Sequence, residues 1–254
     1  MEHITLPNLF YQRTLENKEK PFLWSKQEGE WQSISWEETE KKVKQVAAGL
    51  KYHGIMPGDK IMIVSENRPE WVIADLAINT LNAITVPAYI TNTEDDHRYI
   101  IEHSDAKAVI VSNNILANRV ALAISNVETC NLLITIDEYN GFMPENLKVE
   151  NFEDLISIGN ENISTALHNL NTIDKDDVNC IIYTSGTGGR PKGVMLTHKS
   201  IYHNILGADE LVKQVGDIDH KYLSLVPLSH AYEHLAIFLQ ICLLYTSPSP
   251  RDRG

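Results

Sequence analysis

The sequence predicts an α/β fold in which a parallel β-sheet carries helices on both faces. The first observation is that helical and strand-like segments alternate between residues 35 and 136, which is typical of βαβ units. The second is that the strand-like segments are short and apolar, as expected for strands buried on both faces. The third is composition: 254 residues, 43% hydrophobic and 22% charged, suffice for a substantial core.

The first predicted helix begins after Ser35. Ser35 and Glu38 have the spacing of a capping box, in which each satisfies a backbone N–H group of the other. Gly54 ends the helix, since glycine accepts the left-handed conformation common at helix C-termini. The apolar residues between them fall on one helical face and predict its buried side: Val43, Val46, Ala47 and Leu50.

The alternation continues through two further units. A strand at 60–65 precedes a helix that begins at Pro69, because proline is favoured in the first helical turn. A strand follows at 84–87, and Thr93 caps a helix that reaches Glu102. Apolar runs predict two more strands, at 108–111 and 132–136. Such units build a doubly wound layer.

The sequence changes character between residues 137 and 177. This stretch is polar, rich in asparagine and contains Asn140-Gly141, a turn signal. It therefore predicts a surface excursion before the next strand.

The segment 183–194, YTSGTGGRPKGV, concentrates hydroxyls, glycines and cations between two strand-like runs, 180–183 and 194–197. Its glycines allow the backbone N–H groups to approach an anion, and its hydroxyls add further donors. Arg190 and Lys192 add positive charge. The pattern predicts a loop that joins two strands and holds a polyphosphate.

Two other interpretations of this loop were weighed. A Walker loop requires G-x-x-x-x-G-K-[ST] at the start of a helix, whereas Pro191 precedes Lys192 and Gly193 follows it, which argues against a P-loop kinase or GTPase. The other alternative is a mobile glycine-rich hairpin turn with incidental charge.

The loop together with Pro191-Lys192-Gly193-Val194 resembles the signature of the AMP-forming acyl-adenylating enzymes, which include acyl-CoA synthetases, peptide-synthetase adenylation domains and luciferases. Downstream, Pro227-Leu228-Ser229-His230 is similar to the family's motif at the edge of the acyl pocket. Residues 36–113 also look like the family's N-terminal subdomain. One position departs from the pattern, since the family usually has threonine where this chain has Gly188.

The resemblance implies a fold and a reaction. Residues 1–241 would be a partial AMP-binding domain of layered αβα sheets, truncated before the small C-terminal domain that carries the family's catalytic lysine. The parent enzyme would join a fatty acid to coenzyme A with ATP and Mg²⁺, releasing AMP and pyrophosphate, and this fragment would be inactive. The sequence around Trp71, at 87–89 and at 198–200 resembles that of bacterial long-chain fatty acyl-CoA synthetases. The alternatives are a nucleotide-binding fragment without turnover, and an adenylation domain for another acyl or aryl acid or for a carrier protein.

The resemblance also implies roles within the loop. Thr184 would contact the metal and Lys192 would supply charge to the phosphates, although a solvated surface lysine is the alternative for Lys192. The residues implied to contact phosphate through hydroxyl or backbone groups lie between them: Ser185, Gly186, Thr187, Gly188 and Gly189.

His230 is the implied catalytic residue, placed beside the acyl carboxylate to position it rather than to move protons. The alternative is a structural histidine at a junction between a strand and a helix. His230 and His234, four residues apart, could also face one metal, but nothing nearby in sequence supplies further ligands. Tyr232 and Glu233 are candidates for the pocket wall, although a glutamate also suits the first turn of a helix that begins near Tyr232.

Charge and targeting signals limit the other classes. A net charge of −12 argues against nucleic-acid binding, which needs a basic face. Three widely spaced cysteines argue against a disulfide framework, and the N-terminus shows no secretory signal, so we expect a cytoplasmic protein. The longest apolar run, 235–244, falls short of the ~20 residues of a membrane span. Peripheral contact with a membrane stays open, although no basic amphipathic helix indicates it.

Residues 242–254 differ from the rest. The segment CLLYTSPSPRDRG resembles the conceptual translation of a DNA-library adapter read in frame, and its Ser-Pro-Ser-Pro run would end an apolar helix. We expect this tail not to be native, with a natural proline-rich tail as the alternative.

Overall fold

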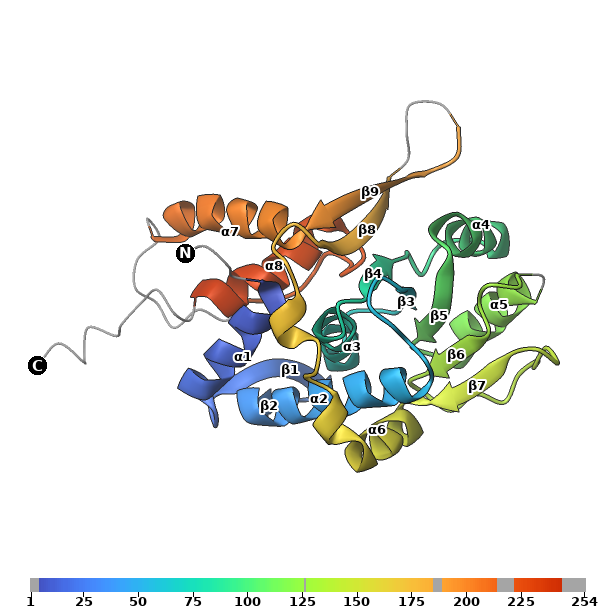
Figure 1. Ribbon diagram of the computed structural model, residues 1–254, viewed down its shortest axis with the longest axis horizontal. Coiled ribbons are helices and arrows are strands. Elements are labelled where there is room, and N and C mark those ends of the chain that lie inside the picture. Colours follow the sequence, from blue (N-terminus) through green and yellow to red (C-terminus); the bar gives the residue numbers. More distant parts are fainter. Residues whose placement is uncertain (1–4, 126, 185–188, 214–221, 244–254) are drawn as a thin grey trace, which may run out of the picture.

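Within the residues that the computed structural model describes, which are 5–125, 127–184, 189–213 and 222–243, a seven-stranded sheet forms the centre of the chain (Figure 1). The strand order is β7-β6-β5-β3-β4-β8-β9, and the neighbouring strands are parallel except for the antiparallel pair β8 and β9. The strands are β3 (Lys60–Val64), β4 (Ile84–Pro87), β5 (Ala106–Val111), β6 (Leu132–Thr135), β7 (Lys148–Asn151), β8 (Val178–Thr184) and β9 (Lys192–Thr197).

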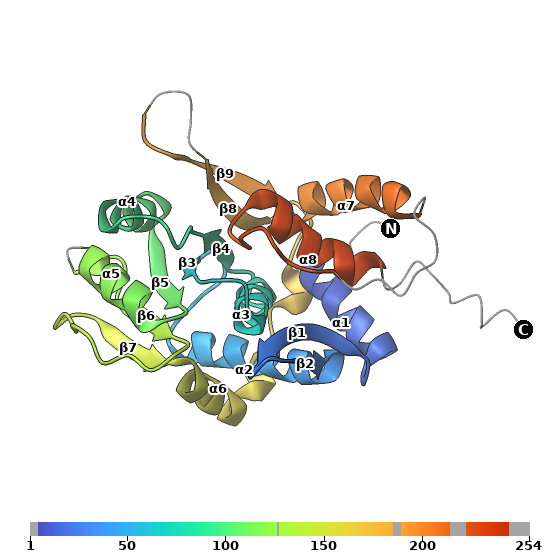
Figure 2. The same cartoon turned by 180° about the vertical axis from the view of Figure 1, so that it is seen from behind.

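Helices cover both faces of this sheet, which confirms the predicted fold class. Alternate residues of β3 show why: Ile61 and Ile63 join one buried cluster, whereas Met62 and Val64 join another on the opposite face. The helices are α1 (Leu6–Asn17), α2 (Trp36–Tyr52), α3 (Pro69–Thr80), α4 (Glu94–Ser104), α5 (Asn114–Ile124), α6 (Phe152–Glu161), α7 (His198–Lys213) and α8 (Ala231–Leu243), with short 3₁₀ turns at Ile163–Thr165 and Leu170–Thr172. The sheet lies between α4 and α5 on one side and α2 and α3 on the other, as both views show (Figure 2).

The predicted element starts are confirmed. The Ser35 hydroxyl accepts from the Glu38 N–H at 3.1 Å, and the Glu38 carboxylate accepts from the Ser35 N–H at 2.8 Å. Thr93 and Asp96 form the same reciprocal arrangement at α4. Gly54 has a φ of 85°, as its predicted role at the helix end requires.

The interpretation of 137–177 as a surface excursion is wrong for part of its length. β7 pairs in parallel with β6, and α6 buries Phe152 and Leu155 against the core. A four-residue polar edge strand has no apolar run to reveal it. Helix α6 lies close to α2 because glycines meet there: a Cβ atom added at Gly159 would stand 1.7 Å from the carbonyl oxygen of Gln45.

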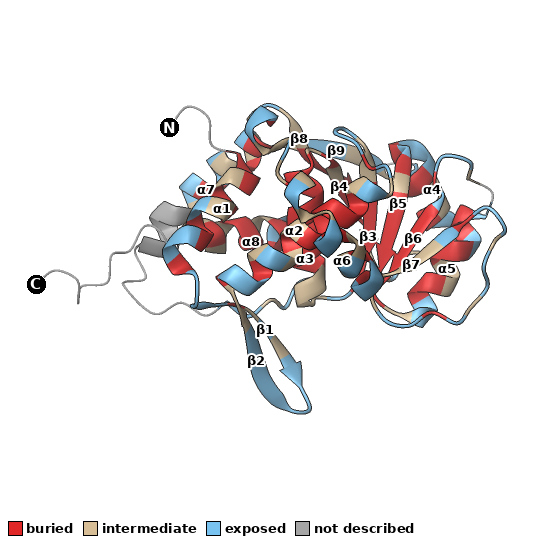
Figure 3. Cartoon of the chain, turned by 60° about the horizontal axis from the view of Figure 1, so that its bottom comes forward, coloured by how far each residue is buried: buried red, intermediate tan, exposed pale blue. Residues whose placement is uncertain are grey.

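Four further features are missing from the sequence-based prediction: α1, α5, α7 and a two-stranded antiparallel hairpin, β1 (Pro21–Gln27) with β2 (Glu30–Ser35). The hairpin projects from the body and is largely exposed (Figure 3). None of the helices in the described part of the chain combines the length and apolarity that crossing a bilayer requires.

Candidate functional site

The predicted phosphate loop spans the turn of a β-hairpin. The loop joins two strands, as predicted; β8 and β9 pair antiparallel, and their last ladder pair is Thr184 opposite Lys192. The loop residues Ser185, Gly186, Thr187 and Gly188 lie outside the described residues. The hairpin extends away from the sheet at the top of Figure 1, beyond α4.

The described ends of this loop have the properties that an anion site needs. Gly189 has a φ of 123° with open space around its Cα, so glycine suits this position. Thr184, Arg190 and Lys192 are exposed. Lys192 is the first residue of β9, so its exposed side chain lies at the end of the ladder that borders the loop.

Helix α4 holds the stem of this hairpin. The Tyr99 hydroxyl donates to the Pro191 carbonyl at 2.9 Å, and the Arg190 guanidinium lies 5.0 Å from the centre of the Tyr99 ring, a cation–π geometry. On the other strand, the Tyr183 hydroxyl and the His103 Nδ1 are 2.7 Å apart. Burial raises the pKa of Tyr183 to about 12, so its phenol stays neutral and able to donate.

His230 lies at the N-terminus of α8, on the exposed surface. Its backbone N–H donates to the Pro227 carbonyl at 2.8 Å, and its Nδ1 accepts from the Tyr232 N–H at 3.2 Å. The imidazole therefore caps the helix through Nδ1, which places the proton of the neutral ring on Nε2. This capping role matches the structural alternative, and the exposed Nε2–H donor is compatible with a role toward a substrate as well.

His234 is turned into the core instead. Its Nε2 lies 2.9 Å from the Asp75 Oδ2 on α3, and the two residues are 2% and 0% exposed. Burial, the largest single effect, lowers the pKa of His234, but the charge and hydrogen bond of Asp75 together with the same effects from Cys180 outweigh burial and raise this pKa to about 10. In the described part of the chain no cluster of three or more His, Cys, Asp or Glu side chains could hold a metal. His230 and His234 thus serve different environments, and a shared metal has no support.

The two other candidates for the pocket wall also separate. Tyr232 is 63% exposed, whereas Glu233 is 1% exposed and accepts from the Tyr222 hydroxyl at 2.9 Å. In the first turn of α8, the Glu233 carboxylate is therefore engaged with another residue of the protein, Tyr222.

A polar cluster that the sequence analysis did not predict lies at the carboxyl edge of the parallel strands. The strand order reverses around β3, which has β4 on one side and β5 on the other. Ligands of doubly wound sheets bind at this edge, at such a switch point. Here the Glu66 carboxylate accepts from the Ser112 hydroxyl and from the Asn113 amide, the latter at 2.7 Å, and Arg68 bonds Asp137 at 3.0 Å. The available signal was the run of polar residues directly after apolar strands.

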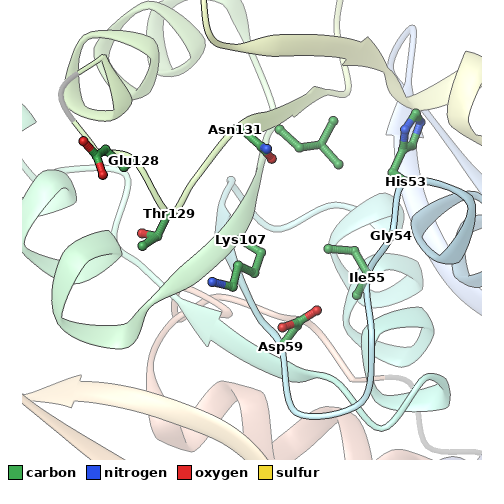
Figure 4. A pocket seen from close by; sticks show the side chains of 9 residues that line it. His53, Gly54, Ile55, Asp59, Lys107, Glu128, Thr129 and Asn131 are labelled. Carbon is green, nitrogen blue, oxygen red and sulfur yellow. The ribbon is translucent and has the colours of Figure 1, made fainter.

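A separate pocket of about 570 Å³ opens at the opposite edge, where β3, β5 and β6 begin (Figure 4). Its charged lining is mixed, since Asp59 and Glu128 are acidic and Lys107 is basic. It contains none of the residues predicted from the sequence to bind substrate.

Three comparisons with known proteins bear on this arrangement. The sequence model of a family described as AMP-binding enzyme matches residues 10–246. Curated relatives include a long-chain-fatty-acid–[acyl-carrier-protein] ligase of Arabidopsis thaliana, 29% identical over 84% of this chain and 31% of that protein. A peroxisomal long chain acyl-CoA synthetase of the same plant is 30% identical over 81% and 29% of the two chains. A long-chain-fatty-acid–CoA ligase of Mycobacterium tuberculosis is 29% identical over 80% and 33%.

Solved structures show the same fold. A long-chain-fatty-acid CoA ligase from Rhodopseudomonas palustris, described as putative, superposes with a TM-score of 0.74 at 19% identity, over 95% of this chain and 56% of that one. The adenylation and carrier didomain of a carboxylic acid reductase from Segniliparus rugosus, in complex with AMP, gives 0.76 at 19% identity, over 94% and 38%. The chain spans about a third of the length of the curated relatives it matches.

Proposed function

Because this chain belongs to the AMP-binding enzyme family, we propose that it is part of an ATP-dependent, AMP-forming ligase that joins a long-chain fatty acid to coenzyme A. The observation that carries the proposal is the β8–β9 hairpin. It presents Thr184 and Lys192 opposite one another at the mouth of a loop rich in glycine and hydroxyl side chains.

The reaction would take place in two displacement steps. A carboxylate oxygen of the acid attacks the α-phosphorus of ATP, and the bond to the bridging oxygen breaks, so pyrophosphate leaves with the electron pair. The coenzyme A thiolate then attacks the acyl carbon, and AMP leaves with the oxygen that came from the acid. The first step brings an anion to a polyanion, so it depends on fixed donors and cations around the phosphates.

The hairpin would supply those groups. Lys192 would place its ammonium against the β- and γ-phosphates, and the backbone N–H groups of 185–189 would donate to phosphate oxygens. The exposed Thr184 hydroxyl is a hard oxygen donor of the kind that Mg²⁺ accepts, so it fits the metal role. When bound, Mg²⁺ would neutralise part of the phosphate charge.

His230 would act on the other substrate. Its Nδ1 is engaged by the Tyr232 N–H, so the neutral ring has one donor left, Nε2–H. We assign this donor to the acyl carboxylate, which it would orient through a hydrogen bond without any proton transfer.

The long-chain substrate rests on the curated relatives, whose names specify long-chain acids. A second candidate is adenylation of a different acid or transfer to a carrier protein. It has support of its own, since a relative is named as an acyl-carrier-protein ligase and one structural neighbour is an anthranilate CoA ligase. A cytoplasmic location belongs to the same proposal, and peripheral contact with a membrane stays open.

The proposal is tested with the protein encoded by the complete gene. Palmitate, octanoate and anthranilate are each offered with ATP, Mg²⁺ and either coenzyme A or acyl carrier protein, and AMP and the thioester are measured. We expect palmitoyl-CoA with equal AMP, and no turnover by the 254-residue chain alone, which spans about a third of the length of its curated relatives. Formation of ADP in place of AMP would reject the family reaction, whereas AMP formed only with anthranilate or only with the carrier protein would favour the second candidate.

Lys192→Ala tests the role of the loop within that assay. We expect acid-dependent pyrophosphate release to fall by about 10²-fold, the usual effect of removing one charge-stabilising group, while thioester formation from supplied acyl-adenylate changes little. Lys199→Ala is the matched control, because Lys199 is an exposed lysine nearby at the start of α7. No loss in either half-reaction would favour the alternative of a solvated surface lysine, and an equal loss in both would reject a role specific to the phosphates.

A further inference from the structure

Asn67 lies at the carboxyl edge of the sheet, three residues beyond the end of β3. Its neighbours Glu66 and Arg68 belong to the polar cluster at the switch point, but the Asn67 side chain turns to another part of the chain. It bonds to the segment 224–228, which is about 160 residues further along and leads directly into the Pro-Leu-Ser-His motif.

The Asn67 carboxamide bonds to every second residue of this segment. Its Nδ2 donates to the Ser224 hydroxyl at 2.8 Å and to the Val226 carbonyl at 2.7 Å, and its Oδ1 accepts from the Leu228 N–H at 2.9 Å. A fully extended segment would carry these residues too far apart to reach one side chain, at about 3.3 Å per residue. The segment therefore curves around the Asn67 carboxamide, with a bend at Val226 and a turn from Leu228.

Burial holds the end of this segment, where Leu228 is 4% exposed and joins the hydrophobic core, but it does little for the start of the segment. Leu223 and Leu225 are 59% and 79% exposed, and residues 222–225 form no helix or strand. At its C-terminal end, the segment continues into α8, and the buried Asp75–His234 pair anchors α8 to α3. Asn67 is thus the polar contact that ties the segment to the edge of the sheet.

We propose that Asn67 is a positioning residue that sets the place of His230 at the acyl site. The Asn67 carboxamide fixes the Leu228 N–H. Leu228 lies in the turn that leads to His230, in which the Pro227 carbonyl accepts from the His230 N–H at 2.8 Å. Moving Leu228 therefore moves the imidazole. The role requires a carboxamide, since only this group offers two donors and an acceptor on one short side chain. The part of the inference that concerns the acyl site rests on the proposed function.

Amide hydrogen exchange in the 254-residue chain tests the contact itself. In Asn67→Ala we expect the Leu228 N–H to exchange about tenfold faster or more, because it loses its acceptor. Asn160→Ala is the matched control: the Asn160 Oδ1 accepts from the Gln45 Nε2 at 3.0 Å and joins α2 to α6, far along the chain from Leu228. The inference is overturned if Leu228 exchanges at the wild-type rate in Asn67→Ala, or if Asn160→Ala accelerates it equally.

Asn67→Asp decides the matter if the alanine variant does not fold. Aspartate still accepts from the Leu228 N–H but places an oxygen against the Val226 carbonyl. Protection at Leu228 should therefore persist while Val226 and its neighbours become more exchangeable. Loss of protection at Leu228 in this isosteric variant, with Val226 unchanged, would contradict the assigned bonds.

Kinetics of the protein from the complete gene test the positioning role. We expect Asn67→Ala to raise the KM for the acid about tenfold, with the KM for ATP unchanged and a smaller effect for Asn67→Asp. Equal rises in both KM values would overturn the positioning role in favour of a general structural one. If the wild-type protein forms no AMP with any acid, the proposed function fails, while the exchange experiment still decides whether Asn67 holds the segment.

Discussion

The buried pair of Asp75 and His234 makes the stability of this chain depend on pH in a defined direction. The pair joins α3 to α8 at 2.9 Å, and both side chains are removed from water. The edge of the Trp71 ring packs against the imidazole, with 5.4 Å between ring centres. The perturbation is Asp75→Asn, which keeps the shape of the side chain and removes its charge.

The magnitude follows from the pKa of His234, which is about 10 in the folded chain and ordinarily 6.5. A group whose pKa is raised by folding stabilises the folded chain fully when the pH is below the pKa of the unfolded chain. This stabilisation is lost as the pH rises through the pKa of the folded chain. At about 1.4 kcal/mol per pH unit, the wild-type chain should lose ~3 kcal/mol between pH 6.5 and 9 from this group. Asp75→Asn should lower the free energy of unfolding by ~3–5 kcal/mol at pH 6.5, because the buried imidazole loses its charged partner and must give up its proton. With His234 neutral at both pH values, this variant should lack the slope.

Urea unfolding followed by tryptophan fluorescence, at pH 6.5 and pH 9, measures both quantities. Asp95→Asn is the matched control, since Asp95 pairs with Arg98 on the surface and its side chain is 81% exposed. That variant should change the free energy of unfolding by less than ~1 kcal/mol and keep the wild-type slope. A wild-type chain equally stable at both pH values, or an Asp75→Asn variant with the same slope as wild type, would refute the assignment.

Two more predictions concern packing and the loop. Gly159→Ala should lower the free energy of unfolding by at least ~2 kcal/mol, because the new methyl group meets the Gln45 carbonyl. Gly207→Ala, in open space on α7, should raise it by up to ~1 kcal/mol in the same denaturation experiment. Similar effects for both would show that α2 and α6 are not in close contact. Tyr99→Phe deletes only the hydroxyl that donates to the Pro191 carbonyl. We expect it to raise the KM for ATP of the complete enzyme about fivefold without lowering the melting temperature. An unchanged KM would show that α4 does not hold the loop.

The parts of the fold that the sequence predicts are those specified by local chemistry. A serine or threonine followed by an acid three residues later identified the starts of α2 and α4, and Pro69 identified the start of α3. The central strands are buried on both faces, so they read as continuous apolar runs. The glycine and hydroxyl content of 184–189, between two such runs, likewise predicted a loop closing a strand pair.

The remaining features depend on contacts between distant residues. The four residues of β7 include a lysine, a glutamate and an asparagine, and pair only because β6 offers an edge. Neither the Asn67 carboxamide nor the Asp75 carboxylate has a local signature, since their partners lie about 160 residues away. His230 was identified only by resemblance, and its bond to the Tyr232 N–H was not foreseen.

The most direct test of the central claim uses a carboxylic acid labelled with ¹⁸O in both carboxylate oxygens, with the protein from the complete gene, ATP and coenzyme A. If the acid attacks the α-phosphorus and the thiol then displaces AMP, one labelled oxygen moves to the phosphate of AMP, and mass spectrometry should find AMP heavier by one ¹⁸O. Unlabelled AMP, or label found only in inorganic phosphate beside ADP, would contradict an acyl-adenylate and with it the function proposed for the hairpin at Thr184 and Lys192.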